Sequence, residues 1–348
     1  MVADVSRRSL QRYLGSLLFA SLTFCAAAQP DDKDPKNATE WFQRAEDQMN
    51  LRMPGSTAFH MKVVFHALPG LVLDKQPSSQ IISGDGVYEE TWVAPKHWRR
   101  EVTLGSYHAI EVQSETARKL QASSDYEPSR VLMLLEALLH PIPRNLSSPL
   151  LSDRHSKWKL ENGAVRDVSF VKISRTSGPS DMQHAYLFLS KGFLVESVEA
   201  GIVTRWQDQI IFAGRVVPRH FGVQGGTRDL LTADVTVETA GTVDPAAFEL
   251  PGELAEPGMT LHPMHSYDAN ISLPNRTYNI GGGLCCFSGI VRQILDRHGA
   301  AREVEVIDSP NPDAAEPLLR LFRDDRFHPA KIDNSPCEIA VYMSWAPR

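Results

Sequence analysis

The chain has 348 residues, of which 42% are hydrophobic and 22% are charged, and its formal net charge is -6. That length allows two domains that each bury a core, and the composition is that of an ordinary globular protein. An acidic chain with interspersed charges gives no electrostatic reason to expect nucleic-acid binding. The one basic cluster, Lys96–Arg100, is short, and we interpret it as a solvated strand rather than an anion site.

Residues 1–28 have the three parts of a secretory signal peptide. These are a charged region, an apolar region and a small-residue cleavage site: Arg7, Arg8 and Arg12, then Tyr13–Phe24, then Ala26–Ala28. We expect cleavage before Gln29 and a periplasmic or secreted product. The alternative is an uncleaved segment that anchors the chain in the inner membrane. Phe24 disfavours lipid attachment at Cys25, because such sites want a small residue there.

Residues 29–39 are polar and predict a flexible leader. A helix then begins, with Thr39 as its expected cap and with Trp41, Phe42, Ala45 and Met49 spaced as one apolar face. Strand patterns follow it, separated by turn residues, and indicate an antiparallel meander. The expected strands are Ala58–Ala67, Gly84–Val93, His97–Leu104, His108–Val112, Ala117–Ser123, Ala164–Ile173, Ala185–Leu189, Leu194–Glu199, Ile202–Trp206, Gln209–Phe212, Arg215–Val223 and Leu230–Glu238.

One helix interrupts the series of strands. Val131–Leu139 is apolar almost all round, which predicts a buried helix in the concavity of the sheet. Residues 257–282 are rich in Pro, Gly and Asn and are expected to form a linker.

Residues 40–256 resemble the LolA/LolB-like periplasmic lipoprotein carriers. The resemblance rests on the order of elements and on four segments: Tyr186–Phe188, Gly192–Leu194, Gly214–Arg219 and Phe248–Pro251. It implies an α+β fold, an antiparallel half-barrel with an internal apolar helix and a concave face that can hold acyl chains. The lining residues that we expect on this basis are Phe65, Trp92, Leu134 and Leu138. The alternative is the same fold with its concavity filled by its own helix.

Residues 283–348 resemble the TonB carboxy-terminal domain. The pattern is two strands, a helix, an Arg-Phe-x-Pro-Ala motif and a third strand: Ile290–Leu295, Arg302–Ile307, Ala314–Phe322, then Arg326, Phe327, Pro329 and Ala330, then Glu338–Ser344. The resemblance implies a small β-β-α-β domain that binds an envelope protein, by strand capture at an open sheet edge. Gly281–Cys286 departs from the family's Tyr-Pro-x-x-Ala segment. Because we expect the signal peptide to be cleaved, we also expect no retained anchor, and the sequence has no long Pro-rich spacer.

Three cysteines would remain after cleavage, namely Cys285, Cys286 and Cys337. In an oxidising compartment this number predicts one disulfide and one odd thiol. The TonB-like resemblance implies that Cys285 or Cys286 pairs with Cys337, and the alternative is three unpaired thiols.

The sequence lacks a recognisable catalytic constellation. His262 and His265, with Asp268 nearby, could ligate a metal, but they lie in the expected linker and we interpret them as solvated. Glu89 and Glu90 are adjacent on a strand, so they face opposite sides and cannot act as an acid/base pair. We therefore expect a protein that is not an enzyme and has no cofactor or resident metal.

The aromatic residues of the early strands allow two interpretations. Tyr88, Trp92, Trp98 and Tyr107 either line an apolar ligand surface or form ordinary core, and we favour core.

Together these features predict an exported, non-enzymatic envelope binding protein. An apolar ligand or lipid would lie in the half-barrel, and the TonB-like domain would dock on a protein partner. The alternative is a structural or energy-transduction adaptor with a filled core, anchored by an uncleaved amino-terminal segment.

Overall fold

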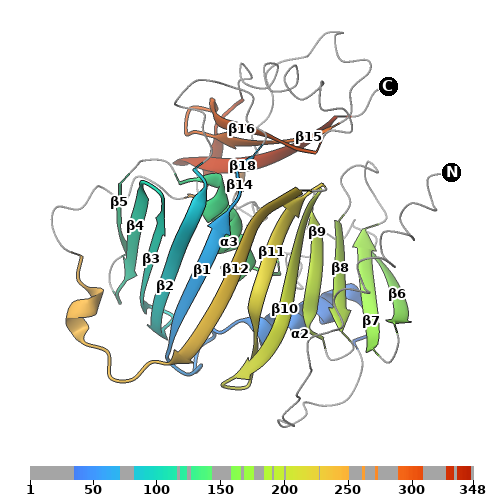
Figure 1. Cartoon of the computed structure of the whole chain (residues 1–348), viewed down its shortest axis with the longest axis horizontal. Helices are drawn as coiled ribbons and strands as arrows, with labels where there is room; N and C mark the ends of the chain where they lie inside the picture. Colours follow the sequence, from blue (N-terminus) through green and yellow to red (C-terminus); the bar gives the residue numbers. More distant parts are fainter. Residues whose placement is uncertain are drawn as a thin grey trace.

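The structure is a computed structural model, and it describes most of the chain (Figure 1). The described residues are 35–70, 82–115, 118–123, 127–142, 158–165, 168–175, 184–189, 192–199, 201–226, 228–250, 261–262, 271–272, 289–308, 327–332 and 335–345. The expected signal peptide and most of the expected leader lie outside these ranges.

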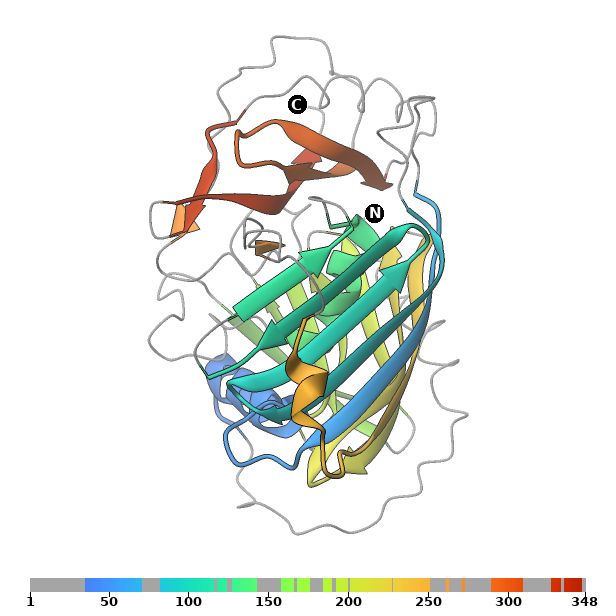
Figure 2. The ribbon, with the colours of Figure 1, turned by 90° about the vertical axis from the view of Figure 1, so that its left-hand side faces the viewer.

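A 12-stranded antiparallel sheet forms the main body, in the order β5-β4-β3-β2-β1-β12-β11-β10-β9-β8-β7-β6. The sheet curls, and its edge strands β5 and β6 do not pair with each other, so it forms an open half-barrel (Figure 2). The strands are β1 (Phe59–Ala67), β2 (Gly84–Ala94), β3 (His97–Leu104), β4 (Tyr107–Gln113), β5 (Arg118–Ala122), β6 (Trp158–Val165), β7 (Val168–Arg175), β8 (His184–Leu189), β9 (Leu194–Glu199), β10 (Ile202–Phe212), β11 (Arg215–Gly225) and β12 (Arg228–Thr239).

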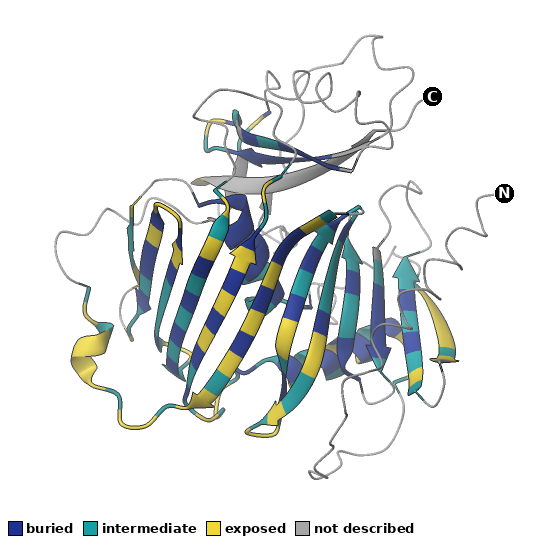
Figure 3. Cartoon of the chain, viewed as in Figure 1, coloured by how far each residue is buried: buried dark blue, intermediate teal, exposed yellow. Residues whose placement is uncertain are grey.

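Alternation along the strands separates an inner face from an outer face (Figure 3). In β1, Phe59, Val63 and Phe65 are buried, whereas Lys62 and Val64 between them are exposed. The antiparallel half-barrel predicted for residues 40–256 is therefore present.

Helix α2 (Ala38–Met49) packs its apolar face on the inner side of the sheet. The ring of Phe42 meets that of Tyr186 edge-on, with centroids 4.9 Å apart. The expected cap, Thr39, was wrong: Asn37 is the N-cap, and its side chain accepts a hydrogen bond from the Glu40 amide. An Asn side chain reaches this amide readily, so the helix begins two residues earlier than predicted.

Helix α3 (Ser129–Leu139) lies on the concave side of the sheet (Figure 1). Its buried residues include Val131, Leu132, Met133 and Leu134, so apolar side chains leave it on every side. The indole Nε1 of Trp206 on β10 donates to the Ala137 carbonyl at 3.1 Å. The predicted internal apolar helix is thus present.

Two strand predictions were wrong. The expected strand Ala164–Ile173 is a hairpin of β6 and β7, and the two strands expected on either side of Asp208 are the single strand β10. Asp208 has φ 49, and its neighbours Gln207 and Gln209 pair with His220 and Pro218 of β11. The positive φ at Asp208 therefore marks a kink within β10 and not the end of a strand.

A second sheet follows, with the strand order β14-β17-β18-β15-β16 and with β13 beside β18. We call it the C-terminal sheet. Its strands are β13 (Leu261–His262), β14 (Ile271–Ser272), β15 (Gly289–Leu295), β16 (Ala301–Asp308), β17 (Ala330–Ile332) and β18 (Ser335–Trp345). The three longer strands match the three that the sequence predicts, whereas the helix expected at Ala314–Phe322 lies outside the described residues. Strands β13 and β14 fall within the segment expected as a linker.

The C-terminal sheet lies across one end of the half-barrel, above α3 (Figure 2). The short helix η2 (Pro245–Phe248) packs outside β3, with the rings of His97 and Phe248 4.0 Å apart. Among the described residues, no helix is long and apolar enough to cross a membrane.

Candidate ligand site on the concave face

Two small cavities flank α3 on the concave side of the half-barrel. The first, about 20 Å³, lies near its C-terminal end and has a mainly apolar lining: Met49, Leu51, Arg52, Met61, Ala137, Leu138, Pro141, Trp206, Val216, Val217, Pro218 and Val235. The second, about 40 Å³, is more polar: Met133, Glu136, Ala137, His140, Pro141, Ser197, Glu199, Ile202, Thr204, Trp206 and Val223. Ala137 and Trp206 border both cavities, so α3 separates two parts of one interior space.

The four residues predicted to line a ligand site all lie in or beside this interior. Phe65, Trp92 and Leu134 are buried in the main core, and Leu138 borders the first cavity. The Phe65 ring lies over Gly86 on the neighbouring strand, because a Cβ built on that glycine would be 2.2 Å from Phe65 Cζ. Trp92 stacks on Phe59, with centroids 5.6 Å apart. Phe65, Trp92 and Leu134 thus serve the core, and Leu138 borders the first of the two cavities described here.

The aromatic residues of the early strands are also core. Tyr88, Trp92, Trp98 and Tyr107 are all buried in the main hydrophobic cluster. The favoured interpretation, ordinary core, agrees with this placement.

A buried ionic cluster centred on Glu90 borders the first cavity. Arg52 Nε donates to both carboxylate oxygens of Glu90, at 2.9 and 3.1 Å, and Arg100 Nε donates at 3.0 Å. The Tyr88 hydroxyl donates to the same carboxylate at 3.0 Å. Arg52 Nη1 also reaches the Leu138 carbonyl of α3 at 3.4 Å. The cluster therefore connects the sheet, the segment after α2 and the C-terminal end of α3.

The charges of this cluster are set by its arginines. Burial alone would raise the pKa of Glu90, but the Arg52 and Arg100 guanidinium groups outweigh burial and lower that pKa to about 2. The pKa of Tyr88 is raised, first by burial and then by the Glu90 charge. Two guanidinium groups thus converge on one carboxylate beside an apolar cavity.

Sequence reasoning treated Arg100 as part of a solvated basic cluster, and this was wrong. Arg100 is an internal ion partner, and its guanidinium lies 4.1 Å from the Trp98 ring centroid. The available signal was the alternation of β2, which places Glu90 on the same face as Tyr88 and Trp92. A carboxylate at an inward position requires a cationic partner, and Arg100 is opposite Glu90 on β3.

Glu199 on β9 and Glu136 on α3 are the two acidic residues that border the second cavity. The Glu199 carboxylate accepts a hydrogen bond from the Tyr186 hydroxyl at 2.9 Å. Burial, together with the Glu136 charge on α3, raises the pKa of Glu199 to about 7 against the opposing effect of that hydrogen bond. Sequence reasoning did not single out Glu199.

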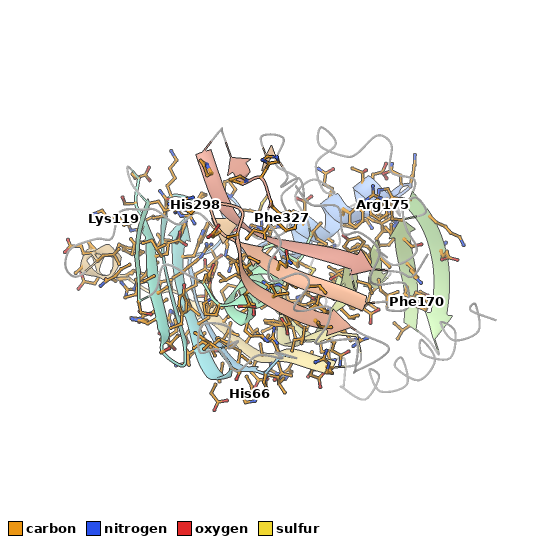
Figure 4. The ribbon with its side chains drawn as sticks, turned by 90° about the horizontal axis from the view of Figure 1, so that it is seen from above. His66, Lys119, Phe170, Arg175, His298 and Phe327 are labelled. Carbon is orange, nitrogen blue, oxygen red and sulfur yellow. The ribbon has the colours of Figure 1, made fainter. Side chains whose placement is uncertain are left out.

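The outer face carries polar side chains and a hollow of its own. Glu89 pairs with Lys62 on this face, opposite to Glu90, as strand geometry predicts. His60 and His66 share this face too, and they contact Thr91 and Asp85. Figure 4 labels His66. A polar hollow of about 380 Å³ crosses β10–β12, where Gly222 leaves space between Arg205, His220 and Asp234.

The part of the chain that the structure describes holds no group of three or more His, Cys, Asp or Glu residues placed to bind a metal. His262 lies in β13, whereas His265 and Asp268 are outside the described residues.

The C-terminal sheet contacts α3 through a buried ion pair. Arg130 Nη1 and Nη2 donate to the two carboxylate oxygens of Glu305 on β16, at 2.9 and 2.7 Å, and both side chains are at most 1% exposed. Arg130 Nε donates to the Leu68 carbonyl at 2.9 Å. Sequence reasoning missed this pair, although an arginine at the start of an otherwise apolar helix was a signal.

The Arg-Phe-x-Pro-Ala motif is only partly described. Phe327 is buried, and its amide donates to the Gly299 carbonyl at 3.0 Å; Figure 4 shows Phe327 beside His298. Pro329 is partly exposed, while Arg326 and the Ala330 side chain lie outside the described part. The proposed disulfide stays a prediction, because Cys285 and Cys286 are not described and Cys337 is described only as backbone of β18.

Comparison with known proteins gives distant structural likenesses only. No protein-family model matches the sequence, and no curated protein matches it. A LolA superfamily protein from Nitrosomonas europaea is 9% identical, with TM-score 0.32, over 61% of this chain and 97% of that chain. A DUF1329 family protein from Desulfovibrio piger is 10% identical, with TM-score 0.36, over 62% of this chain and 98% of that chain. These comparisons do not show a TonB carboxy-terminal domain, so that resemblance stays a prediction.

Proposed function

We propose that the protein is an exported, non-enzymatic binding protein whose half-barrel takes an apolar ligand, such as a lipid acyl chain, under α3. The observation that carries this proposal is the cover on the concave face. Part of that cover is the short helix α3, which has apolar residues on every side and a cavity on each flank. A ligand that displaced α3 would meet the apolar inner face of the sheet.

The construction of α3 supports its role as a movable cover. The helix has 11 residues, and its N-cap, Pro128, makes no side-chain cap hydrogen bond. Helices shorter than about 12–15 residues are marginal in water without tertiary packing. The position of α3 therefore depends on what it docks against, and an apolar ligand can compete for the same surface.

The filled interior favours a second candidate function. Cavities of about 20 and 40 Å³ hold about one to three water molecules, whereas ligand pockets commonly measure about 300–1,000 Å³. A structural adaptor whose concavity is filled by α3 would bind no lipid, and both sheets would then serve protein contacts. Protein docking by the C-terminal sheet belongs to both candidates.

Uptake of an apolar fluorophore separates the two candidates. We expect the full chain, purified from the periplasm of a Gram-negative host, to carry organic-extractable mass in native mass spectrometry and to bind N-phenylnaphthylamine. Ala137→Leu should raise this affinity on the order of tenfold, because overpacking the docked α3 costs about 1–3 kcal/mol and so eases its displacement by the ligand. Ala164→Leu is the matched control, since Ala164 is exposed on β6. A clean mass together with no uptake of the fluorophore would favour the adaptor.

A further inference from the structure

We propose that the C-terminal sheet is an internal clamp that holds α3 closed over the concave face. The clamp consists of the Arg130–Glu305 pair and of the Arg228 contacts to β16. The inference rests on the proposed function, because it assigns a regulator to the same site. Release of the C-terminal sheet from the half-barrel is then the step that frees α3.

The first part of the clamp acts on the N-terminal end of α3. Arg130 lies in the first turn of this helix, and its guanidinium joins three elements, because it donates to the Leu68 carbonyl after β1 as well as to Glu305 on β16. Both members of the ion pair are excluded from water. If α3 moved away while β16 stayed in place, Glu305 would be left as a buried charge without this partner, which is strongly unfavourable.

The second part of the clamp fixes β16 to the sheet. Arg228 at the start of β12 donates through Nη2 to the carbonyls of Val306 and Ile307, both at 3.1 Å. Ile307 is fully buried and belongs to the main core of the half-barrel. Its Cγ2 would lie 2.6 Å from a Cβ at Gly225, so the β11–β12 turn region and β16 are in close contact. Strand β16 is therefore held by the sheet on one side and holds α3 on the other.

The clamp continues into the C-terminal sheet as alternating charges. Arg292 on β15 is opposite Glu305 in the strand register, and its Nη1 lies 3.3 Å from the Glu303 carboxylate. The Arg292, Glu303 and Glu305 side chains are all buried. An interface built on paired charges separates at a lower hydrophobic cost than an apolar one, because ions are rehydrated on exposure. This chemistry suits a contact that opens and closes.

The opposite end of α3 makes two hydrogen bonds through its backbone carbonyls. There the Ala137 carbonyl accepts from Trp206, and the Leu138 carbonyl accepts from Arg52 at 3.4 Å. These are single hydrogen bonds to backbone carbonyls, one of them long. The Arg130–Glu305 contact, by comparison, consists of two short charge-assisted hydrogen bonds, and the C-terminal sheet supplies it.

The test uses the full chain and two variants that act on different sides of the clamp. Glu305→Gln keeps the size of the side chain but removes its charge, and Arg228→Met removes both contacts to the β16 carbonyls without touching α3. Glu89→Gln is the control, because it removes a carboxylate whose ion pair with Lys62 lies on the outer face. Circular dichroism first establishes that each variant is folded.

Hydrogen exchange of residues 129–139 is the readout that needs no ligand. We expect both clamp variants to speed the exchange of these amides on the order of tenfold, with β1 and β12 unchanged, and the control to match the parent chain. The clamp is overturned if the exchange of α3 in both variants equals that of the parent chain. If Glu305→Gln does not fold, Arg228→Met alone decides between these results.

Uptake of N-phenylnaphthylamine separates the clamp from the proposed function. If the clamp variants bind the fluorophore more tightly than the parent chain, both proposals are supported. Faster α3 exchange with no uptake in any variant supports the clamp and contradicts apolar binding. Equal uptake by the parent chain and by both variants, with equal α3 exchange, supports apolar binding and overturns the clamp.

Discussion

Glu90 is an inward-facing carboxylate that stays ionised because two arginines surround it. Its position is readable from the alternation of β2, which buries Tyr88, Glu90 and Trp92 in turn. Its partners are less readable, because Arg52 is 38 residues away in the chain and meets it only after α2 docks. A buried charge with hydrogen-bonded partners is tolerated, whereas loss of one partner leaves the others uncompensated.

Replacement of Glu90 should therefore destabilise the protein. We expect Glu90→Gln to lower the free energy of unfolding by about 3 kcal/mol, because Arg52 and Arg100 would lose the counterion that they share. The measurement is urea unfolding at neutral pH. Glu89→Gln serves as the control and should change the free energy by less than about 0.5 kcal/mol, since this exposed residue pairs only at the surface. Equal effects of the two substitutions would contradict the ionic role of Glu90.

Glu199 and Glu90 should make the stability of the protein depend on pH in opposite senses. The pKa of Glu199 is about 7 in the folded protein against an ordinary value of 4.5, so the folded state holds the proton more tightly. The contribution of Glu199 is fully present below pH 4.5 and is lost as the pH rises to 7. Glu90, with a folded pKa of about 2, contributes stability above pH 4.5 and loses it as the pH falls.

Subtraction of two pH profiles isolates this effect. Between pH 4.5 and 7 the free energy of unfolding of Glu199→Gln should rise by about 1–3 kcal/mol relative to that of the parent chain, because the amide does not ionise there. The measurement is the free energy of unfolding by urea across that range. Parallel profiles for the two chains would show that Glu199 ionises normally in the folded protein.

At the scale of elements, the bounds of strands with alternating buried and exposed residues were predictable from the sequence. The bounds of the edge strand β6 and of the kinked strand β10 were not. β1 has a clear inner row, whereas the edge strand β6 exposes Lys159, Leu160 and Glu161 and lacks the alternation that a prediction needs. Asp208 was read as a break in β10 because a polar pair interrupts the pattern, but pairing with β11 resumes at Gln209. The concave site followed from the buried helix, whereas its ionic lining depends on contacts across the fold.

One cross-strand contact explains why Phe65 is a poor choice for a ligand contact in the closed form. Its ring fills the space over Gly86, where a methyl group would come within 2.2 Å of it. We expect Gly86→Ala to lower the free energy of unfolding by about 1–3 kcal/mol, because the ring must leave its position. Gly241→Ala, at a position with no atom within 4 Å, is the control and should be nearly neutral. Thermal unfolding of both variants tests this; an unchanged Gly86→Ala variant would mean that the ring moves freely.

At the scale of the whole molecule, two meanders share one core and a second sheet joins them. The meander β2–β5 and the meander β6–β11 meet through the pairing of β1 with β12, from Phe59 and Thr239 to Ala67 and Leu231. The sequence indicated both parts but not their contact, because no local pattern marks Arg130 and Glu305 as partners. The C-terminal sheet thus follows the half-barrel in the sequence and also contributes a residue, Ile307, to its core.

The distance of this pair along the chain sets an order of events during synthesis. Glu305 follows Arg130 by 175 residues, and Ile307 joins the core only after Glu305. A chain that emerges amino terminus first therefore carries the cover helix and the inner face of the sheet long before it carries the counterion that holds them together. If the proposed clamp holds α3 in place, newly made protein stays open until β16 has been added and closes only when that strand is synthesised.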